Sequence, residues 1–287
     1  MKKLLALSLA AVMSLSLLTA CSGGSAPSAA PSAAPSESAA PSEPAAPKKL
    51  VLGTSADYPP YEFHILDNGE DKIVGFDIAL AEKIAEDMGA ELEIVDMNFD
   101  NLLTMMAQGK IDFVIAGMES TADREAAADG SDPYYDDLPA MIVVKKANLD
   151  QYTSLDSFTG KNVGAQTGTT KALMATGEDP EVTHVTDANP VLLTNVGDLI
   201  NQLVYDKCDA VILDGSVAMK YVESNSDLAV VEAVSLGEVV QPCVWVADGD
   251  PKGLMDSINA TIAQVTSDGT FDQYVEQANE LSSQAMG

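Results

Sequence analysis

One arginine has a chemistry that sets it apart from the other basic residues of this sequence. Arg124 is the only arginine in the chain, and the other basic side chains are lysines. A guanidinium presents a planar, permanently charged fork that binds a carboxylate through two parallel hydrogen bonds, which a lysine ammonium cannot do. A surface position between Asp123 and Glu125 would also suit a lone arginine. The secondary structure around Arg124 distinguishes a carboxylate-binding arginine from a surface arginine.

A second candidate anion site lies in the segment Gln166-Thr167-Gly168-Thr169-Thr170-Lys171. Glycine and hydroxyl residues before a predicted helix present free backbone N–H groups at the positive end of the helix dipole, where anions bind. The spacing of a nucleotide-binding P-loop is absent. An ordinary helix cap explains the same residues equally well, so the segment supports an anion site without establishing one.

The elements that position these residues alternate between strands and helices. Apolar patterning predicts strands at 49–55, 91–95, 111–116, 140–145, 161–165, 182–185, 209–213 and 239–247, and helices at 75–88, 98–108, 190–206, 251–265 and 270–281. The two prolines of the 57–63 loop are expected to prevent regular strand pairing there. This alternation predicts an α/β fold with mostly parallel sheets, in which ligands bind at the carboxyl ends of the strands.

Two parts of the chain repeat one pattern. Residues 98–118 align with residues 195–215 at an offset of 97, with six identities in 21 positions. Each copy predicts a helix, a buried strand and a polar loop, which contains Arg124 in one copy and Asp214 in the other. Two such lobes would place Arg124 and Asp214 on opposite walls of a cleft with aromatic sides. A carboxylate holder facing an ammonium holder predicts an α-amino acid ligand, because a buried zwitterion needs both charges paired.

Composition limits the other functions. The roughly 240 residues after position 47 exceed one ordinary core, so two lobes are expected. The net charge is −29, or −31 without Lys2 and Lys3, which argues against binding of nucleic acid or an anionic membrane surface. No cysteine and histidine set has metal-ligand spacing, so neither a metal nor a cofactor is predicted. Cys208 and Cys243 are expected to be buried thiols rather than a disulfide.

The amino terminus predicts export and lipidation. A basic start, an apolar run and small residues before Cys21 predict a signal peptide over residues 1–20. Leu18-Thr19-Ala20-Cys21 resembles a lipobox, which implies fatty acyl chains such as palmitate on Cys21. Residues 21–47, rich in Ser, Ala and Pro, are expected to form a disordered tether. We therefore expect a protein anchored by lipid on the extracytoplasmic face of the cell membrane.

The ordered motifs resemble the extracytoplasmic solute-binding proteins of ABC importers for polar amino acids. The resemblance covers about residues 49 to 281 and rests on Asp57-Tyr58-Pro59-Pro60-Tyr61-Glu62-Phe63, Val74-Gly75-Phe76-Asp77, Gly117-Met118 with Thr121 and Arg124, Ser131-Asp132-Pro133-Tyr134-Tyr135, Val163-Gly164 with Gly168-Thr169-Thr170, and Asp209-Ala210-Val211. It implies a type II periplasmic-binding-protein-like fold that closes by hinge motion, with lobe 1 over 48–141 plus 243–287 and lobe 2 over 142–242. The implied partners are a free amino acid and an ABC permease with its ATPase, and the protein is expected to be a monomer.

The same resemblance implies a role for each site residue. Arg124 would bind the α-carboxylate and Asp214 the α-ammonium. The backbone of Glu119, Thr169 and Thr170 would assist Arg124, and the Gly117 carbonyl next to Met118 would assist Asp214. Tyr58 and Phe99 would flank the ligand side chain, and Gln166 matches a position that sets specificity.

Glu119 departs from the family pattern, which usually has Thr or Ser beside the ammonium. If its side chain turns away, only its backbone matters. If it enters the cleft, a second carboxylate beside Asp214 favours a cationic substrate such as arginine or lysine. Two alternatives to a transport protein remain, an amino-acid sensor and a dehydratase-type enzyme. Enzyme function is not expected, because His64 and His184 lie outside the site motifs.

Overall fold

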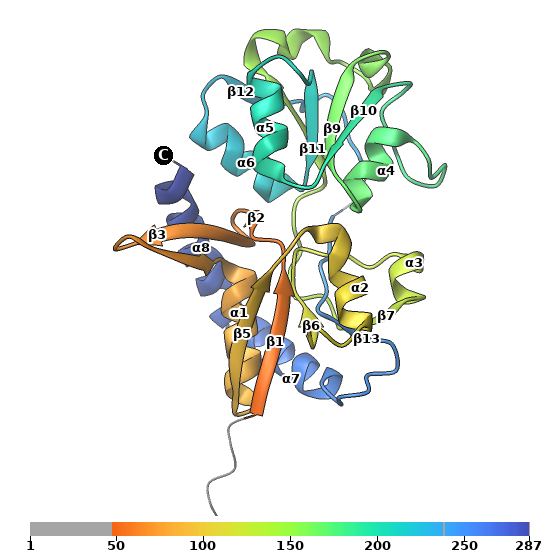
Figure 1. Ribbon diagram of the computed structural model, residues 1–287. Coiled ribbons are helices and arrows are strands. Elements are labelled where there is room, and N and C mark those ends of the chain that lie inside the picture. The colour runs from red at the N-terminus through yellow and green to blue at the C-terminus, as the bar shows by residue number, and fades with distance from the viewer. Residues whose placement is uncertain (1–47, 238, 287) are drawn as a thin grey trace, which may run out of the picture. The chain divides into compact units, whose positions relative to one another are not determined.

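The computed structural model describes residues 48–237 and 239–286 (Figure 1). The predicted signal peptide, Cys21 and the tether up to residue 47 lie outside the described residues.

The described chain builds two five-stranded sheets and one small sheet. The first sheet has the order β5-β1-β6-β13-β7 and contains β1 (Lys48–Thr54), β5 (Ala90–Asp96), β6 (Phe113–Val114), β7 (Ala128–Gly130) and β13 (Trp245–Ala247). The second has the order β10-β9-β11-β8-β12 and contains β8 (Met141–Lys145), β9 (Asn162–Gln166), β10 (Asn189–Leu193), β11 (Ala210–Leu213) and β12 (Leu228–Val230). The small antiparallel sheet contains β2 (Asp57–Tyr58), β3 (Glu62–Asp67) and β4 (Glu70–Val74). The predicted two-lobe α/β class is confirmed, while the exact lobe boundaries stay a prediction.

The two large sheets share one topology. In the first sheet β1 pairs in parallel with β5 and β6, and β13 pairs antiparallel with β6 and β7. In the second sheet β9 pairs in parallel with β10 and β11, and β8 pairs antiparallel with β11 and β12. Each sheet is therefore mixed but mostly parallel, as predicted, because only the strand that crosses between the lobes, β13 or β8, runs against the others.

The sequence repeat is also a structural repeat. Asp112 precedes β6, and its carboxylate accepts a 2.8 Å hydrogen bond from the Val51 amide of the neighbouring strand. Asp209, which is aligned with Asp112, precedes β11 and accepts a 2.8 Å bond from the Asn162 amide. Both strands lie at the centre of their sheets. The loops after β6 and β11 consequently occupy equivalent places at the carboxyl edges of the two sheets.

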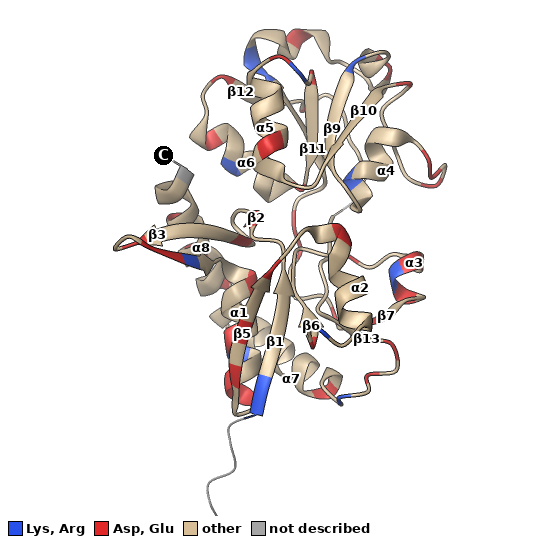
Figure 2. Cartoon of the chain, viewed as in Figure 1, with Lys and Arg blue, Asp and Glu red and all other residues tan. Residues whose placement is uncertain are grey.

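Helices cover the sheets (Figure 1). They are α1 (Phe76–Asp87), α2 (Leu102–Ala107), α3 (Ala122–Glu125), α4 (Thr170–Thr176), α5 (Val196–Val204), α6 (Gly215–Ser224), α7 (Met255–Ser267) and α8 (Thr270–Met286), with 3-10 turns η1 (Phe99–Asn101), η2 (Lys146–Gln151) and η3 (Leu155–Phe158). Trp245, Phe113 and Phe158 are fully buried between these layers. No helix within the described residues has the length and apolar character needed to cross a membrane. Acidic residues lie on β5, on helices of both lobes and in the loops, whereas the strands of the second sheet carry none (Figure 2).

Several predicted elements differ from the observed ones. The predicted helix 190–206 was wrong at its start, because Asn189–Leu193 forms the edge strand β10 and only Val196–Val204 is helical. An edge strand tolerates Pro190, which has no amide to donate. The strands predicted at 111–116 and 239–247 are present, but β6 and β13 are shorter than predicted. Residues 182–185 form no strand in the described chain. The 57–63 loop does pair, with Tyr58 opposite Glu62, because the two prolines lie in the turn between these residues.

Candidate functional site

A cavity lies where the loops after β1, β6, β9 and β11 meet. Its side chains leave a free volume of only about 10 Å³, and it is lined by Ser55, Tyr58, Glu62, Phe99, Ala116, Gly117, Glu119, Gln166, Thr169, Lys171 and Asp214. Seven of the ten predicted site residues are in this lining. Since the lining combines residues that follow strands of both large sheets, the cavity has the location predicted from the carboxyl ends of the strands.

Asp214 is a fully buried acid of the cavity lining, and its side chain has a hydrogen-bond partner in the first lobe. It stands at the N-cap position of α6, yet its side chain makes no capping hydrogen bond. Instead the Tyr58 hydroxyl donates to Asp214 Oδ2 at 2.8 Å, and the Asp214 amide donates back to the same hydroxyl at 2.9 Å. Burial raises the pKa of Asp214 to about 6, with Lys171 opposing that rise. Tyr58 is therefore a polar anchor for Asp214 as well as a predicted aromatic wall.

Glu119 extends its side chain into the space between the lobes. Its Oε1 accepts a short hydrogen bond from the Thr170 hydroxyl and lies 3.2 Å from Lys171 Nζ. Its Oε2 lies 3.4 Å from Arg124 Nη1. Burial alone would raise the pKa of Glu119, but Lys171 and Arg124 lower it to about 2. Of the two orientations left open by the sequence, the structure shows the one that adds a negative charge to the cleft.

Lys171 is a residue of the cavity lining to which the sequence interpretation assigned no role. Its side chain is 5% exposed, and Nζ lies 2.7 Å from Asp214 Oδ1. Burial opposes the charged form, but Asp214 and Glu119 raise the pKa of Lys171 above its usual range. The sequence did contain a signal, because Lys171 ends the predicted anion-binding segment. A lysine at the second position of a helix would ordinarily point to solvent, so its direction could not be deduced.

Arg124 lies beside the cavity rather than in its lining. Thr121 caps the short helix α3 by accepting a 3.3 Å bond from the Arg124 amide. The guanidinium donates from Nη1 to the Glu119 carbonyl at 2.7 Å and from Nη2 to the Gly168 carbonyl at 3.2 Å. It also stacks over Phe99, with Cζ 5.4 Å from the ring centre. Arg124 is thus a buried side chain that joins loops of both lobes. The alternative interpretation of Arg124 as a surface residue is wrong.

Gly117 lies in the left-handed region, with φ of 55°, and its amide donates to Asp77 Oδ2 at 2.8 Å. A Cβ at this position would lie 3.4 Å from the Tyr61 ring. Glycine therefore lets the loop after β6 pass close to the aromatic residues of the small sheet. Met118 follows it, but its side chain is in the hydrophobic core. The Met118 carbonyl accepts bonds from the Cys243 amide and the Trp245 indole.

Gln166 links the lobes at another point of the cavity. Its Nε2 donates to the Thr194 carbonyl at 3.0 Å and to Asp57 Oδ1 at 3.3 Å. The other oxygen of Asp57 accepts a 2.7 Å bond from the Val196 amide. Burial raises the pKa of Asp57 to about 6. Asp57 is therefore a further acidic group close to the residue predicted to set specificity.

Glu62 is a second lining residue that the sequence interpretation did not assign. Its carboxyl group is fully buried, and neither oxygen has a hydrogen-bond partner among the described residues. Burial, followed by the neighbouring Asp77, raises the pKa of Glu62 well above its usual range. Its burial therefore favours the uncharged form of the Glu62 carboxyl group. Cys208 and Cys243 are buried free thiols, as predicted.

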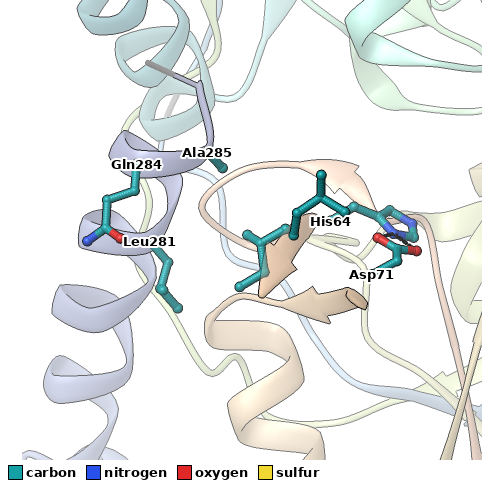
Figure 3. Close-up of a pocket in the computed structure, with 7 residues that line it drawn as sticks. His64, Asp71, Leu281, Gln284 and Ala285 are labelled. Carbon is teal, nitrogen blue, oxygen red and sulfur yellow. Dashed lines mark hydrogen bonds and ion pairs between the residues drawn. The ribbon is translucent and has the colours of Figure 1, made fainter. Parts of the chain in front are cut away.

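A separate pocket of about 460 Å³ lies between the β3–β4 hairpin and the end of α8 (Figure 3). Its lining includes His64, Asp71, Leu281, Gln284 and Ala285. Its one close charged pair in the figure is His64 with Asp71, at 2.9 Å. These two groups bind each other. Neither is therefore available to bind one of the two charges of a zwitterion.

Comparison with known proteins supports the resemblance to amino acid solute-binding proteins. Residues 50–279 match the family model of bacterial extracellular solute-binding proteins, family 3. The arginine-binding extracellular protein ArtP of Bacillus subtilis is 34% identical over 228 residues, which cover 79% of this chain and 84% of that protein. The ABC transporter arginine-binding protein 1 of Escherichia coli is 29% identical over 239 residues, which cover 80% and 90% respectively.

A solved structure shows the same fold. The amino acid ABC transporter substrate-binding protein AbpA of Streptococcus pneumoniae, bound to L-arginine, superposes with a TM-score of 0.76 and 34% identity, covering 82% of this chain and 95% of that one. The matched family and these relatives are solute-binding proteins rather than enzymes. This chain belongs to the bacterial extracellular solute-binding proteins of family 3.

Proposed function

We propose that this protein captures a free amino acid with a cationic side chain, arginine being the first candidate, and delivers it to an ABC importer. The observation that carries the choice of ligand is the side chain of Glu119. Its pKa is lowered to about 2, so it is ionised, and it shares the cavity with Asp214. The names of the relatives point the same way, since two of them are arginine-binding proteins and a third was solved with arginine.

The proposed contacts follow the two charges of the amino acid. Asp214 and the Gly117 carbonyl would bind the α-ammonium. Arg124 would exchange its bonds to the Glu119 and Gly168 carbonyls for the α-carboxylate, which offers a guanidinium fork a stronger, charge-assisted pair of acceptors. Thr169 and Thr170, at the start of α4, would add backbone N–H groups to this carboxylate site.

The ligand side chain would lie between aromatic rings. Tyr58 and Phe99 line the cavity from the first lobe. A guanidinium or ammonium between them would gain cation–π attraction. Gln166 and its partner Asp57 lie within the same region and would supply polar groups to the end of the side chain.

Calorimetry with a panel of amino acids tests this proposal. We expect wild-type protein to bind L-arginine and L-lysine more tightly than L-glutamine, because the cavity carries the extra charge of Glu119. Arg124→Ala should weaken binding by about a hundredfold or more, since a buried carboxylate would lose its charged partner. Lys146→Ala, which removes an exposed basic side chain of the second lobe, is the matched control. Undiminished binding by Arg124→Ala would reject the role given to Arg124.

Anchoring and delivery form the second part of the proposal. We infer that Cys21 carries fatty acyl chains, that the segment up to residue 47 tethers the folded part to the membrane, and that the protein acts as a monomer. Cys21→Ser should release the protein into the medium of expressing cells, whereas wild-type protein should fractionate with membranes and incorporate labelled palmitate. Arginine uptake that is unaffected by deletion of this protein would instead favour the sensory alternative.

A further inference from the structure

Lys171 occupies the place in the cavity where a cation is expected. Its Nζ lies 2.7 Å from Asp214 Oδ1 and 3.2 Å from Glu119 Oε1. Asp214 is the residue proposed above to bind the α-ammonium of the ligand. A side chain of the protein therefore makes, at the same carboxylate, the kind of contact that an amino acid would make.

The position of Lys171 in the chain makes this burial costly without its two acidic partners. It is the second residue of α4, where the positive end of the helix dipole disfavours a cation. Its ammonium is also withdrawn from water, which is unfavourable unless opposite charges compensate. Asp214 and Glu119 provide that compensation, and they come from different lobes. Lys171 thus joins the loop after β6 to the loop after β11.

The contact between Lys171 and Asp214 is close but poorly directed. Asp214 Oδ2 has a donor in Tyr58, whereas Oδ1 receives no hydrogen bond of acceptable geometry from any described residue, although Nζ lies 2.7 Å away. A free ammonium has no side-chain tether and can align one N–H group with this oxygen. An amino acid could therefore satisfy Oδ1 better than Lys171 does.

We propose that Lys171 is a tethered cation that occupies the ammonium site formed by Asp214, and that an incoming amino acid must displace it. This inference rests on the proposed function and adds a residue that sets affinity and specificity. Because Lys171 competes with every α-ammonium, it weakens the binding of all amino acids. Once displaced, it remains beside Glu119 and offsets the negative charge that favours cationic side chains. Lys171 therefore also narrows the preference for basic over neutral amino acids.

Removing the α-ammonium from the ligand provides a test on the unaltered protein. The probes are L-arginine and 5-guanidinopentanoic acid, which is arginine without its α-amino group. In wild-type protein Asp214 keeps Lys171 as its partner when the analogue binds, so we expect the analogue to bind only about tenfold more weakly than arginine. In Lys171→Met the analogue leaves a buried carboxylate without a cation, so we expect a difference of about a hundredfold or more.

The same calorimetric titrations give the second readout. Lys171→Met should bind L-arginine about tenfold more tightly than wild-type protein, because the competing state is gone, and should gain less for L-glutamine. Lys207→Met, which removes an exposed lysine of the same lobe, should match wild-type protein for every probe.

The outcomes separate the two proposals. If wild-type protein binds arginine but loses a hundredfold or more with the analogue, or if Lys171→Met binds arginine no more tightly, the displacement of Lys171 is refuted and amino acid binding stands. If neither protein binds any amino acid, the proposed function fails and this inference fails with it. The wild-type comparison needs no substitution, so it decides the question even if Lys171→Met does not fold.

Discussion

Replacing Tyr58 by phenylalanine should damage the site through two hydrogen bonds while preserving the aromatic ring. The Tyr58 hydroxyl donates to Asp214 Oδ2 at 2.8 Å and accepts the Asp214 amide at 2.9 Å. Tyr58 is 7% exposed and Asp214 is 1% exposed, so water cannot readily replace the hydroxyl. Tyr58→Phe therefore leaves both a carboxylate oxygen and a backbone N–H group without a partner in the closed lobes.

The size of the effect follows from these two losses. A hydrogen bond to a charged group contributes about 1.5 to 3 kcal/mol, and an unsatisfied buried amide costs about 1 to 3 kcal/mol. Allowing for local relaxation, we expect the closed, ligand-bound form to lose about 2 to 4 kcal/mol. Because each 1.4 kcal/mol is a factor of ten in affinity, L-arginine should bind about 30-fold to several-hundred-fold more weakly.

Tyr134→Phe is the matched control for this prediction. The Tyr134 hydroxyl also donates to a buried carboxylate, that of Asp77, at 2.9 Å, and neither residue lines the cavity. In Tyr134→Phe the same Asp77 oxygen keeps its bond from the Gly117 amide, so the loop that carries Gly117 stays held. It should lower the midpoint of chemical denaturation while leaving the affinity for arginine within about threefold. Calorimetry and urea unfolding on both variants separate the effect on arginine affinity from the effect on stability. If Tyr58→Phe binds arginine as tightly as Tyr134→Phe does, the bond between the lobes has no role in binding.

Three further predictions follow from the same geometry. Arg124→Lys keeps the charge but not the fork, so arginine affinity measured by calorimetry should fall by about tenfold or more. The raised pKa of Asp57, about 6, means that its contribution to stability is complete below pH 4 and is lost as pH rises through 6; Asp57→Asn should flatten the urea-unfolding stability profile across that window. Asp112→Ala and Asp209→Ala should each lose about 1 to 2 kcal/mol of unfolding free energy, because each removes the equivalent bond to a neighbouring strand; unequal losses beyond that range would show that the two bonds do not contribute equally to stability.

The sequence located the two central strands, although not the exact bounds of β6, because their signals are local. A buried apolar run followed by a polar loop identified the segments before Gly117 and Asp214, and the offset of 97 related them to each other. The structure places both segments at the centre of their sheets. Such a run can be recognised from consecutive residues alone, because a central strand is buried on both faces.

Side-chain direction across the cavity could not be read in the same way. Lys171 lies on a helix whose first turn could face either solvent or the cleft, and the choice depends on two carboxylates far away in sequence. The same is true of Glu119, whose partners are Thr170 and Lys171. For Pro190, helix patterning was misleading because its position at a sheet edge is a tertiary property.

The polar residues proposed to hold the ligand are also the residues that hold the lobes together. Tyr58 bonds to Asp214, Glu119 to Thr170 and Lys171, and Arg124 to the Gly168 carbonyl, and each of these bonds joins one lobe to the other. A ligand that enters the cavity must therefore replace contacts between the lobes as well as add its own. Its affinity is the difference between these two sets of contacts, so substitutions in the cavity act on closure and on ligand contact together. This coupling explains why a tighter-binding variant, such as the one expected for Lys171, can arise from removing a favourable contact of the protein with itself.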